Sequence, residues 1–247
     1  MRSPPHPDWI TPDWPAQRRV HALITTRSGG VSSGKFASLN LSARVGDDPQ
    51  CVARNRAILR ACLPAEPAWV KQVHGTAVID AARASPDAEA DGVVTQDAGS
   101  VCAVMTADCL PVLLSDRAGK SAGIAHAGWR GLAGGIVENV VHAMGVPPRD
   151  LIAYIGPGIG ARRYEVGEDV RRAFVDRDPA AATSFAPRQN GKYFVDLYEL
   201  VRRRLAAAGI AEVYGGEFCT ATEERFFSFR RDQTTGRMAS VIWLEED

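Results

Sequence analysis

The stretch VCAVMTADCLPVLLSDRAGKSAGIAHAGWR, residues 101–130, contains three short β-rich runs in close succession. They cover residues 101–106, 111–115 and 121–125, and Asp, Gly and Pro residues separate them. No helix fits between runs that lie so close together. Strands that cluster in this way, without regular alternation with helices, favour an α+β fold with a mixed sheet over a doubly wound α/β fold.

The rest of the chain extends this pattern in both directions. Further strands are predicted at 20–26, 69–74, 76–80, 92–95, 151–155, 212–218, 226–230 and 238–244, and helices at 48–62, 132–144, 168–175 and 195–208. No linker divides the chain after residue 20. We therefore expect one layered α+β domain over residues 20–247, with mixed β-sheets flanked by helices. A proline-rich lead precedes it over residues 1–19, and we expect Trp9 and Trp14 to pin this lead onto the domain.

Composition narrows the class of protein. The 247 residues include 29 Lys and Arg against 29 Asp and Glu, so the formal net charge is zero, which argues against non-specific nucleic-acid binding. No apolar run approaches the roughly 18 residues of a membrane span, so no membrane partner is expected. Five cysteines form no C-x-x-C pair, and the proline-rich lead has no apolar signal region. These features predict a cytoplasmic protein with free thiols.

Three side chains have the setting of ligand-binding residues. His74 and His126 each close a β-rich run and precede small residues, and Cys109 lies between two predicted strands. Two imidazoles and one thiolate would make a three-ligand zinc site with a fourth position open for water or substrate. Spacing leaves two alternatives: these are ordinary core residues, or Cys109 is a nucleophile with a histidine as its base.

Other candidates are weaker when taken singly. Arg130 and Arg230 each have a planar fork that suits phosphate, and Asp91 and Asp108 could orient an imidazole. The glycine-rich segment 155–160 follows a strand but does not open a helix, so it is interpreted as a turn whose amides could meet an anion.

Together these residues lie within longer blocks that resemble one family. The blocks are WVKQVHG (69–75), ADGV (90–93), TADCLP (106–111), AHAGWRG (125–131), IGP (155–157), YEVG (164–167) and FRRD (229–232). The chain resembles the laccase-domain family, also described as polyphenol oxidase, purine nucleoside phosphorylase or peptidoglycan editing factor. The resemblance covers nearly the whole chain after residue 20.

The resemblance implies a layered α+β fold and a metal centre formed by His74, Cys109 and His126. It implies zinc as the usual metal, with copper as the second candidate. It also implies small-molecule substrates, namely purine nucleosides and phosphate: phosphorolysis of adenosine, inosine, guanosine and S-methyl-5'-thioadenosine, with adenosine deamination. In this reading Arg130, Arg230, Asp108 and Asp91 contact substrate, and one of the two acids protonates the leaving base. The alternatives are an editing factor that binds or hydrolyses UDP-muramyl amino acids, and a Cys–His hydrolase.

The histidine count argues against one of the family's names. A multicopper laccase requires many histidines, commonly in His-x-His pairs, whereas this chain has five and no such pair. The zinc nucleobase deaminase signature, H-x-E with P-C-x-x-C, is also missing from the sequence. We therefore expect a single metal centre, and any deamination would use a different set of residues.

Overall fold

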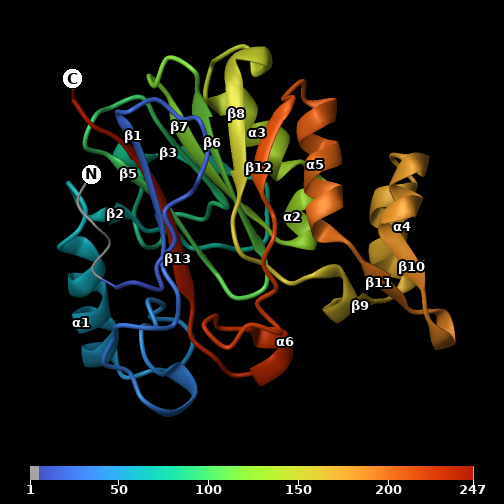
Figure 1. Ribbon diagram of the computed structural model, residues 1–247, viewed down its shortest axis with the longest axis horizontal. Coiled ribbons are helices and arrows are strands. Elements are labelled where there is room, and N and C mark those ends of the chain that lie inside the picture. Colours follow the sequence, from blue (N-terminus) through green and yellow to red (C-terminus); the bar gives the residue numbers. More distant parts are fainter. Residues whose placement is uncertain (1–5, 247) are drawn as a thin grey trace.

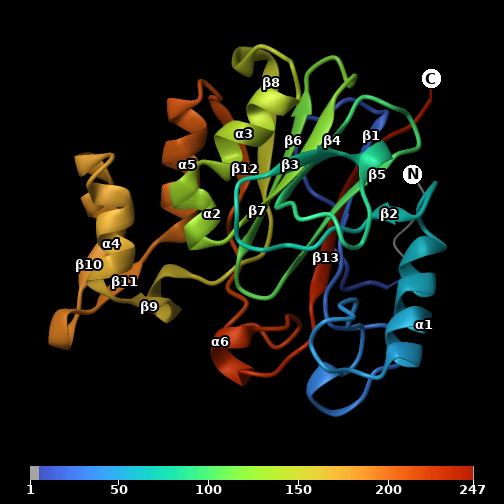
Figure 2. The same cartoon turned by 180° about the vertical axis from the view of Figure 1, so that it is seen from behind.

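The core of the protein is a pair of β-sheets packed face to face. In the computed structural model, which describes residues 6–246, helices cover the outer face of each sheet (Figures 1 and 2). The four-stranded sheet has the order β1 (Val20–Ile24), β13 (Met238–Leu244), β5 (Val101–Thr106) and β2 (Pro67–Ala68). The six-stranded sheet has the order β12 (Glu212–Gly215), β8 (Leu151–Ile155), β6 (Leu110–Asp116), β7 (Ala122–Ala127), β4 (Gly92–Thr95) and β3 (Val78–Asp80).

Both sheets are mixed. In the first, β2 pairs with β5 in parallel while β13 is antiparallel to its neighbours. In the second, β3–β4 and β8–β12 are parallel and the central pairs are antiparallel. The expected α+β class with mixed sheets is thus confirmed.

Strand β5 shows how the period of two builds the layers. Val101 and Ala103 face a core shared with α1 (Pro49–Arg60), whereas Cys102 and Val104 face the core between the two sheets. Both sets are almost fully buried. Because each face of this sheet meets an apolar layer, its strands are mostly apolar on both faces rather than alternating regularly with polar residues.

Capping side chains set where two of the longer helices begin. The remaining α-helices are α2 (Trp129–Gly134), α3 (Ile136–Ala143), α4 (Glu168–Val175), α5 (Leu197–Ala207) and α6 (Phe229–Asp232). As expected from Asp48-Pro49, the Asp48 carboxylate caps α1 and accepts a hydrogen bond from the Gln50 N–H at 2.8 Å. Asp196 caps α5 in the same way, accepting from the Glu199 N–H at 3.0 Å, so this helix begins two residues later than predicted.

A small third sheet was not predicted. It has the order β10 (Phe185–Pro187), β11 (Tyr193–Val195) and β9 (Glu165–Val166), and together with α4 it projects from the side of the domain beyond α5 (Figure 1). Its strands contain two or three residues each, which is too short for a periodic pattern to be recognised in the sequence.

Three predicted elements were wrong. The strand predicted at 226–230 is a buried loop followed by α6, so Arg230 lies on a helix. The helix predicted at 132–144 is two helices, because Gly135 adopts a left-handed conformation with φ of 105° that ends α2 before α3 begins. The predicted strand at 69–74 is mainly a loop, which holds one isolated bridge at Lys71.

The described part of the lead packs onto the domain as expected. Trp9 is 4% exposed, and the Trp14 ring meets Tyr154 edge-on at 6.1 Å between centroids. All five cysteines are free thiols. Among residues 6–246, no helix is both long and apolar enough to cross a membrane.

The break at Gly135 gives a prediction about stability. Replacing Gly135 with alanine should reduce the free energy of unfolding by about 1–2 kcal/mol, since a Cβ atom disfavours the left-handed conformation although space is available. Gly135→Asn is the matched control and should lose less, because asparagine tolerates this conformation better. Urea denaturation measures both. A more stable Gly135→Ala variant would contradict this account of the break.

Candidate metal centre

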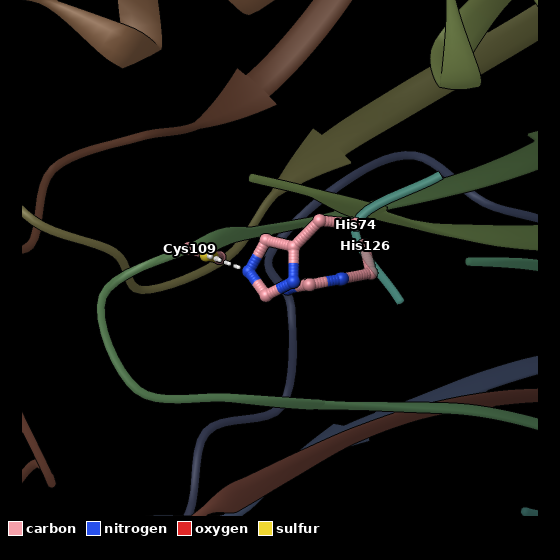
Figure 3. A group of neighbouring side chains, drawn as sticks. All are labelled: His74, Cys109 and His126. Atoms are coloured by element: carbon pink, nitrogen blue, oxygen red, sulfur yellow. Dashed lines mark hydrogen bonds between the residues drawn. The ribbon is translucent and has the colours of Figure 1, made fainter. Parts of the chain in front are cut away.

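Three side chains from separate segments converge at one end of the six-stranded sheet. His74 lies in the loop before β3, Cys109 in the turn between β5 and β6, and His126 near the end of β7. Their ligand atoms all lie within 4.8 Å of one another. Cys109 Sγ is 3.7 Å from His74 Nε2 (Figure 3). The centroids of the His74 and His126 rings are 4.7 Å apart, and the angle between the ring planes is 74°. The sequence spacing, 35 and then 17 residues, conceals this convergence.

Strand register brings Cys109 and His126 together. In the antiparallel β6–β7 pair, Leu110 lies opposite Ala127 and Pro111 opposite His126. Cys109, the residue before β6, therefore lies at the same end of the hairpin as His126. Ladder hydrogen bonds between neighbouring strands therefore bring these two residues to the same place.

Asp91 attaches His74 to this hairpin. Its carboxylate has no solvent exposure and accepts hydrogen bonds from three consecutive backbone N–H groups, those of Val73, His74 and Gly75, at 3.1, 3.0 and 2.7 Å. The same carboxylate lies 2.7 Å from His126 Nδ1. Because Nδ1 faces Asp91, the other ring nitrogen of His126, Nε2, is the one available to a metal ion in the cluster.

The loop at His74 adopts a conformation that is unusual for a residue with a side chain. His74 has φ of 59° and Asp108, beside Cys109, has φ of 93°. Each left-handed residue costs about 1–2 kcal/mol relative to ordinary backbone. The hydrogen bonds to Asp91 offset this cost at His74, so the conformation persists at the point where the imidazole must turn toward the cluster.

Gly128 provides the space that the cluster occupies. A Cβ atom at this position would lie 2.7 Å from His74 Cδ2 and 3.0 Å from Cys109 Sγ, closer than packed atoms approach. A glycine is therefore required immediately after β7, which gives the small residues following His126 a specific steric reason.

The charges in the cluster favour a thiolate. Burial by itself raises the pKa of the Cys109 thiol. The neighbouring His126 and His74 lower it by more than burial raises it, so that the pKa falls to about 6. Burial lowers the pKa of His126, while Cys109 and Asp91 raise it to about 9. The thiolate is the form of cysteine that binds metals and attacks electrophiles.

The donor set fits one zinc ion. Zn–N bonds near 2.05 Å and Zn–S bonds near 2.3 Å at a tetrahedral angle place nitrogen and sulfur roughly 3.6 Å apart. The Cys109–His74 separation of 3.7 Å agrees with that value. Within residues 6–246 this is the one group of three or more His, Cys, Asp or Glu side chains with converging ligand atoms, so a set of several laccase copper ions does not fit.

The three side chains open into a pocket of about 470 Å³, a size typical of small-molecule sites. Its walls combine aromatic side chains with arginines. The other lining residues are Ser42, Arg44, Val45, Val70, Gln72, Met105, Thr106, Ala107, Asp108, Trp129, Ile159, Tyr164, Leu197, Phe229, Arg230 and Arg237.

The four predicted substrate-contact residues differ in placement. Arg230 lines the pocket, with its guanidinium carbon 5.0 Å from the Tyr164 ring centroid. Asp108 also lines it, but its carboxylate accepts from the Thr220 hydroxyl and the Arg230 N–H, both at 2.6 Å. Arg130 is exposed on the Trp129 ring and does not line the pocket. Asp91 lies behind the wall, where no substrate contact is available to it.

The glycine-rich segment 155–160 is a turn, as predicted, but its amides are not free to bind an anion. The N–H groups of Gly156, Gly158, Ile159 and Gly160 donate to Pro111 O, Tyr198 Oη, Asp108 O and Cys219 Sγ, respectively. The segment instead packs against the turn that carries Cys109, and the Ile159 N–H donates to the carbonyl of Asp108 in that turn.

Sequence reasoning did not single out several pocket residues. Tyr164 belongs to the YEVG block, which was a usable signal, and Phe229 begins the FRRD block. Arg44 and Arg237 lie in no recognised block, and only the folded structure brings them to this pocket.

Comparisons with known proteins agree with this architecture. The chain is 49% identical to a purine nucleoside phosphorylase of Pseudomonas aeruginosa over 240 residues, covering 96% of this chain and 99% of the relative. It is 48% identical to the purine nucleoside phosphorylase YfiH of Escherichia coli over 240 residues, covering 95% and 98%.

A crystal structure of a Neisseria meningitidis protein is similar with a TM-score of 0.93 and 51% identity, covering 97% of this chain and 100% of that one. A Bacillus licheniformis protein named YfiH gives a TM-score of 0.85 at 32% identity, covering 92% and 93%. The family model described as multi-copper polyphenol oxidoreductase laccase matches residues 21–245. Because that match spans nearly the entire chain, the protein belongs to this laccase-domain family.

Proposed function

We propose that this chain is a zinc-dependent purine nucleoside phosphorylase acting on adenosine, inosine, guanosine and S-methyl-5'-thioadenosine, with a secondary adenosine deaminase activity. The observation that carries the proposal is the His74–Cys109–His126 cluster at the wall of a pocket of about 470 Å³. Support for the reaction comes from relatives at 49% and 48% identity that are named purine nucleoside phosphorylases.

In phosphorolysis, a phosphate oxygen forms a bond to the anomeric carbon of the ribose while the bond to the purine nitrogen breaks. The electron pair and one proton leave with the base, and ribose 1-phosphate remains. Zinc held by the three side chains would supply a Lewis acid with one open position. The chain itself must hold the planar base, hold the anion and deliver the proton.

Aromatic side chains in the pocket suit the base. Trp129, Tyr164 and Phe229 all contribute to its walls, and Phe229 is 50% exposed, unusual for so large an apolar residue. A purine that covers this ring removes apolar surface from water, and aromatic rings stack favourably with offset planes.

The proton donor requires a side chain whose hydroxyl or carboxyl group is free. Neither acid considered from the sequence qualifies, since Asp91 and Asp108 both accept hydrogen bonds from the protein through their carboxylates. The Tyr164 hydroxyl has no hydrogen bond to another described residue, and burial raises its pKa to about 12, which keeps it protonated at neutral pH. The proposal therefore gives Tyr164 the role of a neutral hydrogen-bond donor to the leaving base, since a phenol with so high a pKa is too weak an acid to transfer its proton fully.

A cysteine hydrolase is the second candidate. Cys109 Sγ lies 3.7 Å from His74 Nε2, and the lowered pKa of the thiol gives a thiolate near neutral pH. Such an enzyme would need no metal and would be inactivated by alkylation of Cys109. Metal content therefore separates the two functions.

The first prediction from the proposed function concerns metal content. The purified protein should carry about one zinc ion per chain, and Cys109→Ala and His126→Ala should each lose most of it, since two remaining ligands are too few. Elemental analysis by mass spectrometry measures this. Cys51→Ala, a cysteine on α1 remote from the cluster in the fold, is the matched control and should retain the metal. Full zinc retention in both ligand variants would refute the site.

The second prediction concerns Asp91. Asp91→Asn should weaken zinc affinity about 10- to 100-fold, because an amide cannot replace a carboxylate that accepts from three N–H groups and orients His126. Competition with a fluorescent zinc chelator measures the affinity. Asp97→Asn, an exposed acid after β4, should bind zinc like the wild type. Equal affinity in the Asp91 variant would show that the carboxylate does not orient the ligands.

The third prediction concerns activity. Incubation of adenosine, inosine or S-methyl-5'-thioadenosine with phosphate should release free base and a sugar 1-phosphate, detected by chromatography. Without phosphate the release should stop, which distinguishes a phosphorylase from a hydrolase. His74→Ala should abolish turnover, whereas His142→Ala, on the exposed side of α3, should retain it.

A folded, zinc-loaded protein that releases no base from any purine nucleoside would overturn the phosphorylase proposal. The peptidoglycan-editing function would then be tested with UDP-linked muramyl amino acids, by binding and by release of the amino acid.

A further inference from the structure

The pocket beside the metal centre carries an excess of positive charge. Three arginines, Arg44, Arg230 and Arg237, line it, and Asp108 is the one acidic residue among the lining side chains. Both oxygens of that carboxylate already accept hydrogen bonds from the protein, as described above. The arginines therefore differ in whether anything in the described chain balances them.

Arg44 is balanced at the rim. Its Nη2 atom donates to the Pro86 carbonyl at 2.7 Å and lies 3.5 Å from the Asp87 carboxylate. Its side chain is half exposed, so water solvates the remaining charge. The charge of Arg44 is therefore already balanced by the Asp87 carboxylate and by water.

Arg237 is fixed but not balanced. Its Nη1 atom donates to the carbonyls of Thr235 and Gly236, both at 3.0 Å, and its backbone N–H donates to Asn40 Oδ1 at 2.9 Å. Within residues 6–246, no carboxylate forms an ion pair with it, and its Nε and Nη2 donors have no acceptor. The side chain is partly buried. A guanidinium that is anchored at one nitrogen and presents its other donors to a pocket is preorganised for a planar anion contact.

The pKa of Arg237 is consistent with an unmet charge. Burial lowers this pKa, and the negative charges of Cys109 and Asp108 only partly offset the effect. Arg237 and Cys109 both line this pocket. An anion bound between them would lie beside the metal centre.

Arg230 provides a second guanidinium at the same pocket; like Arg44 it is exposed to water, but within the described chain it has no carboxylate partner. The backbone N–H of Arg230 donates to Asp108 Oδ2 at 2.6 Å, and the Arg230 side chain lies over the Tyr164 ring. Its side chain makes no hydrogen bond or ion pair with another residue of the described chain. Asp108 thus joins the turn that carries Cys109 to the helix that carries this arginine.

We propose that Arg237 and Arg230 together form a phosphoryl-binding seat beside the metal centre, in which Arg237 is the fixed member and Arg230 the adjustable one. The inference rests on the proposed function where the ligand is the phosphate co-substrate. The same chemistry would also hold the diphosphate of a nucleotide sugar, so the test includes both sources. Arg130 takes no part, because it lies outside the pocket.

Calorimetric titration of the zinc-loaded full chain with inorganic phosphate and, separately, with uridine diphosphate tests the seat. Arg237→Gln and Arg230→Gln should each weaken binding at least about tenfold, since each removes a charge-assisted hydrogen-bonding group. Arg237→Lys should recover part of the affinity, because it restores the charge without the planar fork. Arg172→Gln, an exposed arginine on α4, is the matched control and should bind like the wild type.

A kinetic measurement separates binding of the anion from binding of the nucleoside. In phosphorolysis of inosine, the two Gln variants should raise the KM for phosphate about tenfold and change the KM for inosine less than twofold. Zinc content and circular dichroism should match the wild type, which excludes unfolding. Arg230→Gln is the safer variant, because its exposed side chain has no bond to lose.

The outcomes distinguish the seat from the proposed function. Phosphate binding that both variants weaken supports the seat with phosphate as its ligand. Binding of uridine diphosphate alone, weakened in the same way, supports the seat, assigns it to a nucleotide and counts against phosphorolysis. The proposal is overturned if neither compound binds the wild type, or if both variants bind within twofold of it.

Discussion

The buried carboxylate of Asp91 is the interaction on which the site depends. A carboxylate with no access to water is strongly unfavourable unless donors replace its hydration. Here three backbone N–H groups and one imidazole N–H replace it. Burial by itself raises the pKa of Asp91. His126 and the backbone donors lower it by more than burial raises it, so the carboxyl group remains ionised. Those donors belong to the segments that carry His74 and His126, so satisfying one charge also positions two ligands.

The general layout could be predicted from the sequence because the strands are apolar along their length and closely spaced. The residues around 101–125 have no other way to bury both faces than between two apolar layers. The failure at 226–230 has a specific cause. Phe226 and Phe227 look like strand residues, yet they are fully buried as a loop, and the next turn is helical because Ser228 caps it. Local sequence propensity did not reveal that the Ser228 hydroxyl accepts a hydrogen bond from the Arg231 N–H.

The site was predictable to a different extent. His74, Cys109 and His126 could be selected because each lies at or near the end of a β-rich run and has small neighbours. The arginines could not be ranked, since a guanidinium's role depends on what balances it in space. Arg130 belongs to the AHAGWRG block but stacks on Trp129 outside the pocket. Arg237 adjoins no block and reaches the pocket because Asn40, 197 residues away in sequence, fixes its backbone.

The hairpin that carries two of the three ligands has a consequence for the order in which the site is assembled. Cys109 and His126 are 17 residues apart and are joined by neighbouring strands, so the entropy lost in closing that loop is small. His74 is separated from Cys109 by 35 residues, and its backbone is held beside it by Asp91, the residue before β4. A half-site of one thiolate and one imidazole therefore needs only a local hairpin, whereas the complete site needs β4 docked beside β7. The third ligand makes the affinity for metal dependent on the completed sheet, and bound metal in turn favours the fully folded chain over partly folded ones.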